Sequence, residues 1–281
     1  MARGDSVLNK IAQKFLFLLV TLIIVFFSLL PFIWFFITSL KTEVEVTSIP
    51  PTLIPSGSLN FYRSGIEQYD LLHFVKNSII IAGLTSIITL VIAIFAGYAL
   101  ARLRLPFKRV ILGSLLVVSM FPQISIAGPV WRILQSLGWL NSYQGLILPY
   151  VTLTLPLGVW IIASFFKELP DELEDAARID GCGHLQTLFR IMMPLAAPGI
   201  FTAAILIFIY SWNEFFFALL IMTQRDYQTL PVGIALFQGQ YTLPWGEIAA
   251  ASTIATVPLV LLVFIFQKRI MSGLSAGAVK G

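Results

Sequence analysis

The sequence predicts an all-α polytopic membrane protein with six transmembrane helices. Of its 281 residues, 58% are hydrophobic and only 11% are charged, whereas charged residues make up about a quarter of an ordinary soluble domain. The apolar residues also gather into six long runs, and a helix needs roughly 20 apolar residues to cross a hydrocarbon core of about 30 Å. Composition and run length therefore both indicate a lipid environment.

The first apolar run, residues 15–38, follows several positive charges, as the core of a signal peptide does. It is too long for a cleavable segment and lacks a small-residue cleavage pattern, so we expect a retained first span. The other predicted spans are residues 77–100, 110–131, 143–166, 200–222 and 248–266. We find no internal repeat and no soluble domain, and we expect residues 1–281 to form one transmembrane domain.

The distribution of basic residues predicts the orientation of the spans. If the N-terminus is cytoplasmic, thirteen of the 18 Lys and Arg residues lie on the cytoplasmic side. The five on the other side are Lys41, Arg63, Lys76, Arg132 and Arg225. This bias follows the positive-inside tendency, so we expect both termini in the cytoplasm.

The sequence lacks the residues that several classes of function require. The single cysteine, Cys182, excludes an internal disulfide, and no His or Cys cluster has metal-ligand spacing. No GxxxxGK[ST] motif is present, so the chain is not expected to hydrolyse ATP. The net charge of +4 could suggest an anionic partner, but in a membrane protein the location of Lys and Arg is more informative than their sum. We expect no metal, no enzyme activity and no nucleic-acid partner.

The cytoplasmic loop, residues 167–199, is the most informative stretch. Pro170 and the four acids that follow it are typical of a helix start, because acids favour the positive end of the helix dipole. Gly181 and Gly183 then interrupt the helix. In a second predicted helix, apolar residues at helical spacing form one face until Pro194; they are Leu185, Leu188, Phe189 and Met192. The loop is either a knob for a partner or a surface loop packed on its own bundle.

Part of this loop resembles the EAA motif of ABC importer permeases. The matching residues are Asp175, Ala176 and Ala177, then Asp180 and Gly181, and later Phe189, Ile191, Pro194 and Leu195. The resemblance implies that the loop docks into a cleft on the ATPase subunit. Asp175 stands where the family usually has Glu, and Glu174 lies next to it, so either carboxylate is a candidate for the anchor.

The resemblance extends over nearly the whole chain, toward the carbohydrate branch of that family and its maltose-type and trehalose-type subunits. It implies the type I permease fold, a second and different permease subunit, an ATPase dimer that binds ATP and Mg, and an extracytoplasmic sugar-binding protein, all in a bacterial inner membrane. The implied substrate is an α-glucoside disaccharide such as maltose or trehalose. Glucosylglycerol, glycerol phosphate and other polyol conjugates are alternatives.

Two further regions are candidates for contacts with partner proteins. The C-terminal tail, with Gly273, Gly277, Lys280 and Gly281, is similar to a tail that reaches toward the ATPase, or it is a disordered end. The outer loop with Gln238, Gly239, Gln240 and Tyr241 matches one that contacts the binding protein, or it is an ordinary loop.

Trp212, Asn213 and Glu214 lie in the fifth span and are candidates for the translocation path. A carboxylate in hydrocarbon is costly and usually faces a cavity or a polar partner. Glu214 is therefore either a path residue or an acid bonded to a neighbouring helix.

Two rival functions would need features that we do not find. A secondary transporter would be expected to show paired repeats and several ionisable groups inside the membrane, and here there is one such group and no repeat. A membrane enzyme would need converging acids, histidines or metal ligands near the end of a span.

Overall fold

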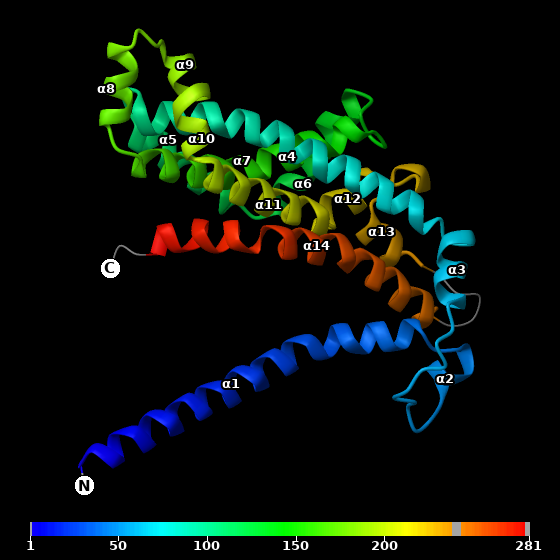
Figure 1. Ribbon diagram of the computed structural model, residues 1–281. Helices are drawn as coiled ribbons and strands as arrows, with labels where there is room; N and C mark the ends of the chain where they lie inside the picture. The colour runs from blue at the N-terminus through cyan, green and yellow to red at the C-terminus, as the bar shows by residue number, and fades with distance from the viewer. Residues whose placement is uncertain (1, 238–242, 279–281) are drawn as a thin grey trace. The chain divides into compact units, whose positions relative to one another are not determined.

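The computed structural model describes the backbone of residues 2–237 and 243–278, and the side chains of residues 13–237 and 243–267 (Figure 1). Every regular element in these residues is a helix. The elements are α1 (Ala2–Ser39), α2 (Glu43–Thr47), α3 (Asn60–Glu67), α4 (Leu71–Arg102), α5 (Lys108–Ser119), α6 (Gln123–Ser136), α7 (Tyr143–Glu168), α8 (Glu172–Ile179), α9 (His184–Thr187), the π-helix η1 (Leu188–Met192), α10 (Met193–Leu195), α11 (Ala197–Asn213), α12 (Phe216–Ile221), the 3₁₀ turn η2 (Arg225–Tyr227), α13 (Leu230–Ala235) and α14 (Trp245–Ala278).

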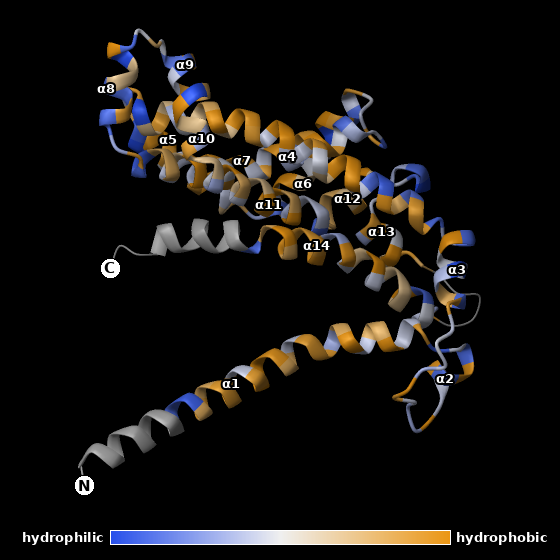
Figure 2. Cartoon of the chain, in the orientation of Figure 1, coloured by the Kyte–Doolittle hydropathy of each residue, from blue (hydrophilic) through white to orange (hydrophobic). Residues whose placement is uncertain are grey.

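The chain divides into two compact units, and the first consists of Met1–Asp70 with Phe237–Thr256. Its longest element is α1, whose apolar side chains are exposed along most of its length; Phe17, for example, is 75% exposed. In Figure 2 the coloured part of this helix is mostly orange, the colour of hydrophobic residues. An exposed apolar helix of this length requires lipid or an apolar partner around it.

The second unit consists of Leu71–Leu236 with Val257–Gly281. Helices α4, α7 and α11 pack against one another at its centre (Figure 1). Two groups of buried side chains fill the spaces between them, one around Ile162, Phe166 and Ile207 and the other around Tyr150 and Phe217. The loop that contains α8 and α9 stands at the end where α4 finishes, and α12 and α13 lie toward the other end.

Among the residues that the structure describes, four helices are long and apolar enough to cross a membrane. Up to six spans result if each of two bent helix pairs counts as one, and these pairs are Lys108–Ser119 with Gln123–Ser136 and His184–Leu195 with Ala197–Asn213. The four are Gln13–Ser39, Leu71–Arg102, Tyr143–Glu168 and Trp245–Gln267. They contain the predicted spans 15–38, 77–100, 143–166 and 248–266. The predicted all-α membrane fold is therefore confirmed.

The other two predicted spans are not continuous helices. In residues 110–131, α5 ends at Ser119 and α6 begins at Gln123, with a bend of 92° between them. Pro122 occupies the N-cap position of α6, and its missing N–H and the restriction it places on the residue before it oppose a continuous helix. In residues 200–222, α11 ends at Asn213, and α12 starts only at Phe216.

Helix α14 extends beyond the predicted span 248–266 and continues to Ala278. Gly273 and Gly277 therefore lie in a helix, which the low core-forming capacity of the tail did not predict. Lys280 and Gly281 lie outside the described residues.

Candidate functional site

The acidic helix α8 begins the loop that follows α7. Glu172, Glu174 and Asp175 lie in its first turn, where negative charge interacts favourably with the helix dipole. At its other end, the Gly181 N–H donates to the Arg178 carbonyl over 3.1 Å and the Cys182 N–H donates to the Ala177 carbonyl over 2.8 Å. These two bonds form a Schellman motif.

Gly181 occupies the left-handed position that this motif requires, with φ of +78°. A side chain in this conformation is strained, and glycine avoids the strain. Apart from Gly181 and its two chain neighbours, no described atom lies within 4 Å of the place where a Cβ on Gly181 would stand. The glycine predicted at the corner of the loop therefore forms a sharp and open corner.

The two neighbouring carboxylates have different surroundings. The side chain of Glu174 is 9% exposed and points toward Arg178 and Arg102, with its oxygens 3.7 Å and 3.9 Å from their guanidinium nitrogens. The side chain of Asp175 is 69% exposed and lies 3.4 Å from Arg178. Glu174 is thus used within the chain, whereas Asp175 is accessible to a partner.

The alanines of the motif divide in the same way as the acids. Ala177 is buried at 1% exposure, while Ala176 is exposed. Together with Asp175, Ile179, Asp180 and Gly181, Ala176 forms an outward surface that we call the α8 corner. Ile179 is 86% exposed on it. The corner therefore presents small, apolar and acidic groups to its surroundings.

The second half of the loop packs on the bundle through part of its predicted apolar face. Leu188 and Met192 are completely buried in the central core. Leu185 and Phe189 remain exposed at 63% and 51%, and the Phe189 ring meets the ring of Phe95 edge-on at 5.9 Å. A single apolar face was predicted from α-helical spacing, and the structure differs because residues 188–192 form a π-helix with a wider turn. Pro194 is the second residue after the π-helix and lies in α10.

The three residues predicted for the translocation path have different surroundings. Trp212 is 3% exposed and its ring stacks on Phe208 at 5.7 Å. Asn213 is exposed and donates through its amide nitrogen to the Ile209 carbonyl of the preceding turn over 2.8 Å. Of the three residues, Asn213 alone presents its side chain to the surroundings.

Glu214 lies between α11 and α12 and is 8% exposed. Its carboxylate accepts three hydrogen bonds. The Phe217 N–H donates to its Oε1 over 3.0 Å, and the Ala218 N–H and the Tyr150 hydroxyl donate to its Oε2 over 3.3 Å and 2.6 Å. The carboxylate therefore satisfies the free N–H groups at the start of α12 and connects them to α7. Sequence reasoning singled out Glu214 but missed its partner Tyr150.

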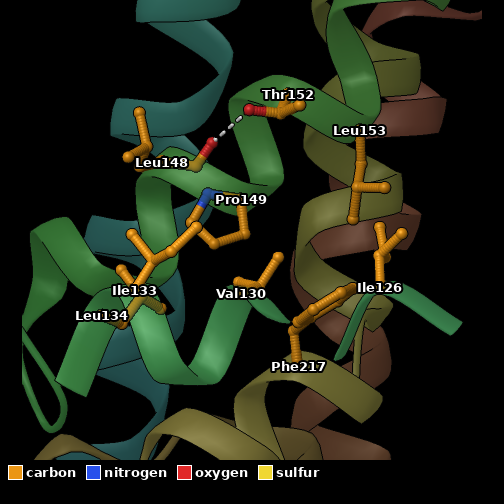
Figure 3. A pocket seen from close by; sticks show the side chains of 9 residues that line it. All are labelled: Ile126, Val130, Ile133, Leu134, Leu148, Pro149, Thr152, Leu153 and Phe217. Carbon is orange, nitrogen blue, oxygen red and sulfur yellow. Dashed lines mark hydrogen bonds between the residues drawn. The ribbon is translucent and has the colours of Figure 1, made fainter. Parts of the chain in front are cut away.

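An apolar pocket of about 160 Å³ lies beside α6 and α7 (Figure 3). Its lining residues are Ile126, Val130, Ile133, Leu134, Leu148, Pro149, Thr152, Leu153 and Phe217. The hydroxyl of Thr152 donates to the Leu148 carbonyl over 3.0 Å. The lining thus offers a sugar almost no polar partner.

Of the predicted tail contact, Gly273 and Gly277 lie in α14. Gln238, Gly239, Gln240 and Tyr241 of the outer loop lie outside the described residues, as do Lys280 and Gly281 of the tail. In the described side chains, no group of three or more His, Cys, Asp and Glu residues could hold a metal ion.

The chain is similar in sequence to a family model and to known proteins. A family model described as "Binding-protein-dependent transport system inner membrane component" matches residues 89–275. The chain is 43% identical over 283 residues to the trehalose/maltose transport system permease protein MalG of Thermococcus litoralis, covering 97% of this chain and 99% of that protein. It is 44% identical over 255 residues to the sulfoquinovosyl glycerol transport system permease protein SmoH of Agrobacterium fabrum, covering 90% of each.

A solved structure shares the fold. It is the structure of a bacterial ABC transporter involved in the import of the acidic polysaccharide alginate. One of its chains superposes with a TM-score of 0.78 at 20% sequence identity, over 91% of this chain and 95% of that one.

Proposed function

Because the chain belongs to the family of binding-protein-dependent transport system inner membrane components, we propose that it is the permease subunit of an ABC importer for a small sugar. Membership in this family implies a substrate-binding protein and an ATPase as partners. It also makes the chain a membrane transport component and not an enzyme. ATP and Mg would be bound by the ATPase subunits, and a second, different permease subunit would complete the pathway through the membrane.

The observation that carries this proposal is the α8 corner. Asp175 and Ala176 are exposed, and the open turn at Gly181 presents no side chain. We propose that this corner enters a cleft of the ATPase, with Phe189 and Pro194 in the segment that supports it. Closure of the ATPases around ATP would then move the loop and switch the bundle between outward and inward access.

Within the corner, Asp175 is the carboxylate proposed to meet the ATPase. The Glu174 carboxylate lies between two arginines of its own chain, and turning it outward would leave the guanidinium of Arg102 with one fewer counter-charge. Asp175 pairs with Arg178, whose side chain is 58% exposed, so its pairing with a basic partner side chain would leave no buried charge short of a counter-charge. Asp175, which stands where the family usually has glutamate, would then contact the ATPase. Glu174 would pair with Arg102 and Arg178 of its own chain.

The proposed substrate is an α-glucoside disaccharide such as maltose or trehalose. A relative at 43% identity is named as a trehalose/maltose permease, and we place this chain in the same substrate class. A relative at 44% identity is named for sulfoquinovosyl glycerol, which favours a sugar linked to glycerol as the second candidate. A binding assay on the purified sugar-binding partner would separate the two.

Other contacts expected from the sequence are part of the same proposal. Residues 238–241 would contact the sugar-binding protein, and the tail from Gly273 to Gly281 would reach toward the ATPase. We propose that Asn213, whose side chain is exposed, contacts the translocation pathway.

The isolated chain is expected to have no ATPase activity, because no sequence in it can bind a triphosphate. Hydrolysis and sugar uptake should both appear in proteoliposomes when the ATPase, the second permease subunit and the binding protein are added. The measurement is phosphate release by the purified chain alone and by the complex. Sustained hydrolysis by the chain alone, with contaminating ATPases removed, would contradict the permease assignment.

We further propose that both termini are cytoplasmic and that the membrane is the inner membrane of a bacterium. This orientation puts the loop between α1 and α3 outside and the α8 corner inside. The bias of the basic residues supports it, with thirteen of the 18 on the cytoplasmic side.

An impermeant thiol reagent is expected to label a cysteine at Ser56 in intact cells and to leave Cys182 unlabelled. Ser56 is exposed in the outer loop, and Cys182 is half-buried behind the α8 corner. The measurement compares Ser56→Cys in a Cys182→Ser background with the unmodified chain, before and after cells are opened. Labelling of Cys182 in sealed cells would reverse the proposed orientation.

A further inference from the structure

Arg102 is a buried charge at the point where three helices meet. It is the last residue of α4, and its side chain is only 4% exposed. A buried guanidinium is tolerated when its N–H groups and its charge have partners. The partners of Arg102 come from α7 and from the start of the docking loop, 64 or more residues later in the sequence.

One set of partners is the C-terminal end of α7. The Phe166 carbonyl would normally accept a hydrogen bond from the N–H of residue 170, but that residue is Pro170 and has no N–H. Arg102 supplies the missing donors, because its Nε and Nη2 lie 2.9 Å and 2.5 Å from the Phe166 oxygen. Its Nη2 also donates to the carbonyl of Leu169. The side chain of Arg102 therefore caps α7.

The other set of partners belongs to α8. The Nη1 of Arg102 donates to the carboxylate of Asp171, which directly precedes α8, and its Nε lies 3.9 Å from the Oε1 of Glu174. Asp171 is exposed at 92%, whereas the Glu174 side chain is nearly buried at 9%. A planar guanidinium can serve both sides at once because it has five N–H donors in a fixed fork, which the ammonium of lysine lacks.

We propose that Arg102 is the positioning residue that makes α4, α7 and α8 move as one body. This inference rests on the proposed function, in which the ATPase moves the α8 corner. The second half of the loop is fastened to the bundle by the buried side chains of Leu188 and Met192. The first half is exposed on its outer side. On its inner side Ala177 is buried, and Arg102 links this half to α4 and α7 through its ion pairs and carbonyl bonds. Movement of α8 therefore reaches α4 and α7 through this side chain.

The expected consequence of losing Arg102 is uncoupling. In Arg102→Met, the α8 corner keeps its docking residues and its turn at Gly181, so the ATPase should still bind and hydrolyse ATP. The movement of α8 would no longer drive the bundle, and sugar transported per ATP hydrolysed should fall by about tenfold or more, a coupling loss of the size typical between linked sites. Arg102→Lys should restore the ratio only in part.

The experiment measures uptake and hydrolysis in proteoliposomes for the complete complex, together with the amount of ATPase that co-purifies. Arg104→Met is the matched control, because Arg104 is exposed two residues further on, and its ratio should equal that of the wild type. A purely structural role of Arg102 would lower the amount of complex but leave the ratio per complex unchanged. That result would overturn the inference.

A second variant keeps the inference testable if Arg102→Met does not accumulate. Asp171→Asn removes one exposed counter-charge and buries no new charge, and it should lower the uptake per ATP by about two- to fivefold. An unchanged ratio in both Arg102→Lys and Asp171→Asn would overturn the inference while leaving the docking proposal intact. A wild-type complex that retains no ATPase would instead refute the proposed function, and this inference with it.

Discussion

Gly181→Val is expected to abolish ATP-driven uptake and to loosen the ATPase from the membrane, while the bundle still folds and inserts. Gly181 has φ of +78°, and a β-branched residue reaches this conformation at a cost of about 1–2 kcal/mol. The chain itself has room for the side chain, because no atom lies within 4 Å of its Cβ position. The methyl groups would instead project from the α8 corner into the space proposed for the ATPase.

A matched control separates docking from backbone strain. Gly57 also has a positive φ, of +79°, and no atom of the chain within 4 Å of a Cβ there, but it lies in the proposed outer loop. Gly57→Val carries the same strain and should leave uptake and ATPase retention unchanged. The measurement for both variants is co-purification of the ATPase, with uptake and expression determined in parallel.

Two further substitutions test the same surface through different physical properties. Asp175→Lys replaces an exposed acid with a base and should repel a basic docking partner. Ala176→Glu places a charge and a longer side chain on the small apolar part of the corner. A free surface loop would tolerate Asp175→Lys and Ala176→Glu within about 0.5 kcal/mol, and Gly181→Val would cost it only the backbone strain. Normal uptake with normal ATPase retention in all three would mean that the coupling site lies elsewhere.

Hydropathy predicted the membrane fold because the length and apolarity of a span are local properties of the sequence. The spans 77–100 and 143–166 lie inside α4 and α7. The breaks within two other predicted spans were not foreseen. Each break depends either on partners outside the apolar run or on a proline. The effect of a proline differs with its surroundings, because Pro149 and Pro156 lie within α7 and do not break it.

The α8 corner was predictable in its conformation. A helix with acids in its first turn and a glycine at its end is a local pattern, and the structure has both the helix and the left-handed glycine. The different environments of Glu174 and Asp175 were not predictable, because they depend on contacts of Glu174 with Arg102 that span 72 positions. Arg102 gave only one local signal, its place at the end of an apolar run.

Glu214 shows the same division between local and long-range information. Its presence in an apolar run marked it as important, but the run also suggested one continuous helix over 200–222. The carboxylate instead accepts the N–H groups of Phe217 and Ala218 at the start of a new helix. Its third partner, Tyr150, lies on α7 and could not be inferred from the sequence around Glu214.

Glu214→Ala is expected to prevent accumulation of the folded protein. The substitution leaves three donors without their acceptor, namely the hydroxyl of Tyr150 and the N–H groups of Phe217 and Ala218. Each buried unsatisfied group costs about 1–3 kcal/mol, and lipid supplies no water to replace the lost acceptor. The sum is comparable with the total stability of many domains, roughly 5–15 kcal/mol. The measurement is the monodisperse yield after detergent extraction, with the thermal unfolding midpoint of what remains.

Two control variants determine whether Glu214 acts through these bonds or through the pathway. Tyr150→Phe removes one donor and leaves the two backbone bonds of Glu214 in place, so its unfolding midpoint should fall less than that of Glu214→Ala. Asn213→Ala removes a bond to the Ile209 carbonyl within a single turn and should leave the yield close to that of the wild type. If Glu214→Ala instead folds as well as the wild type and changes only uptake, then the carboxylate serves the translocation path and the helix-joining role is wrong.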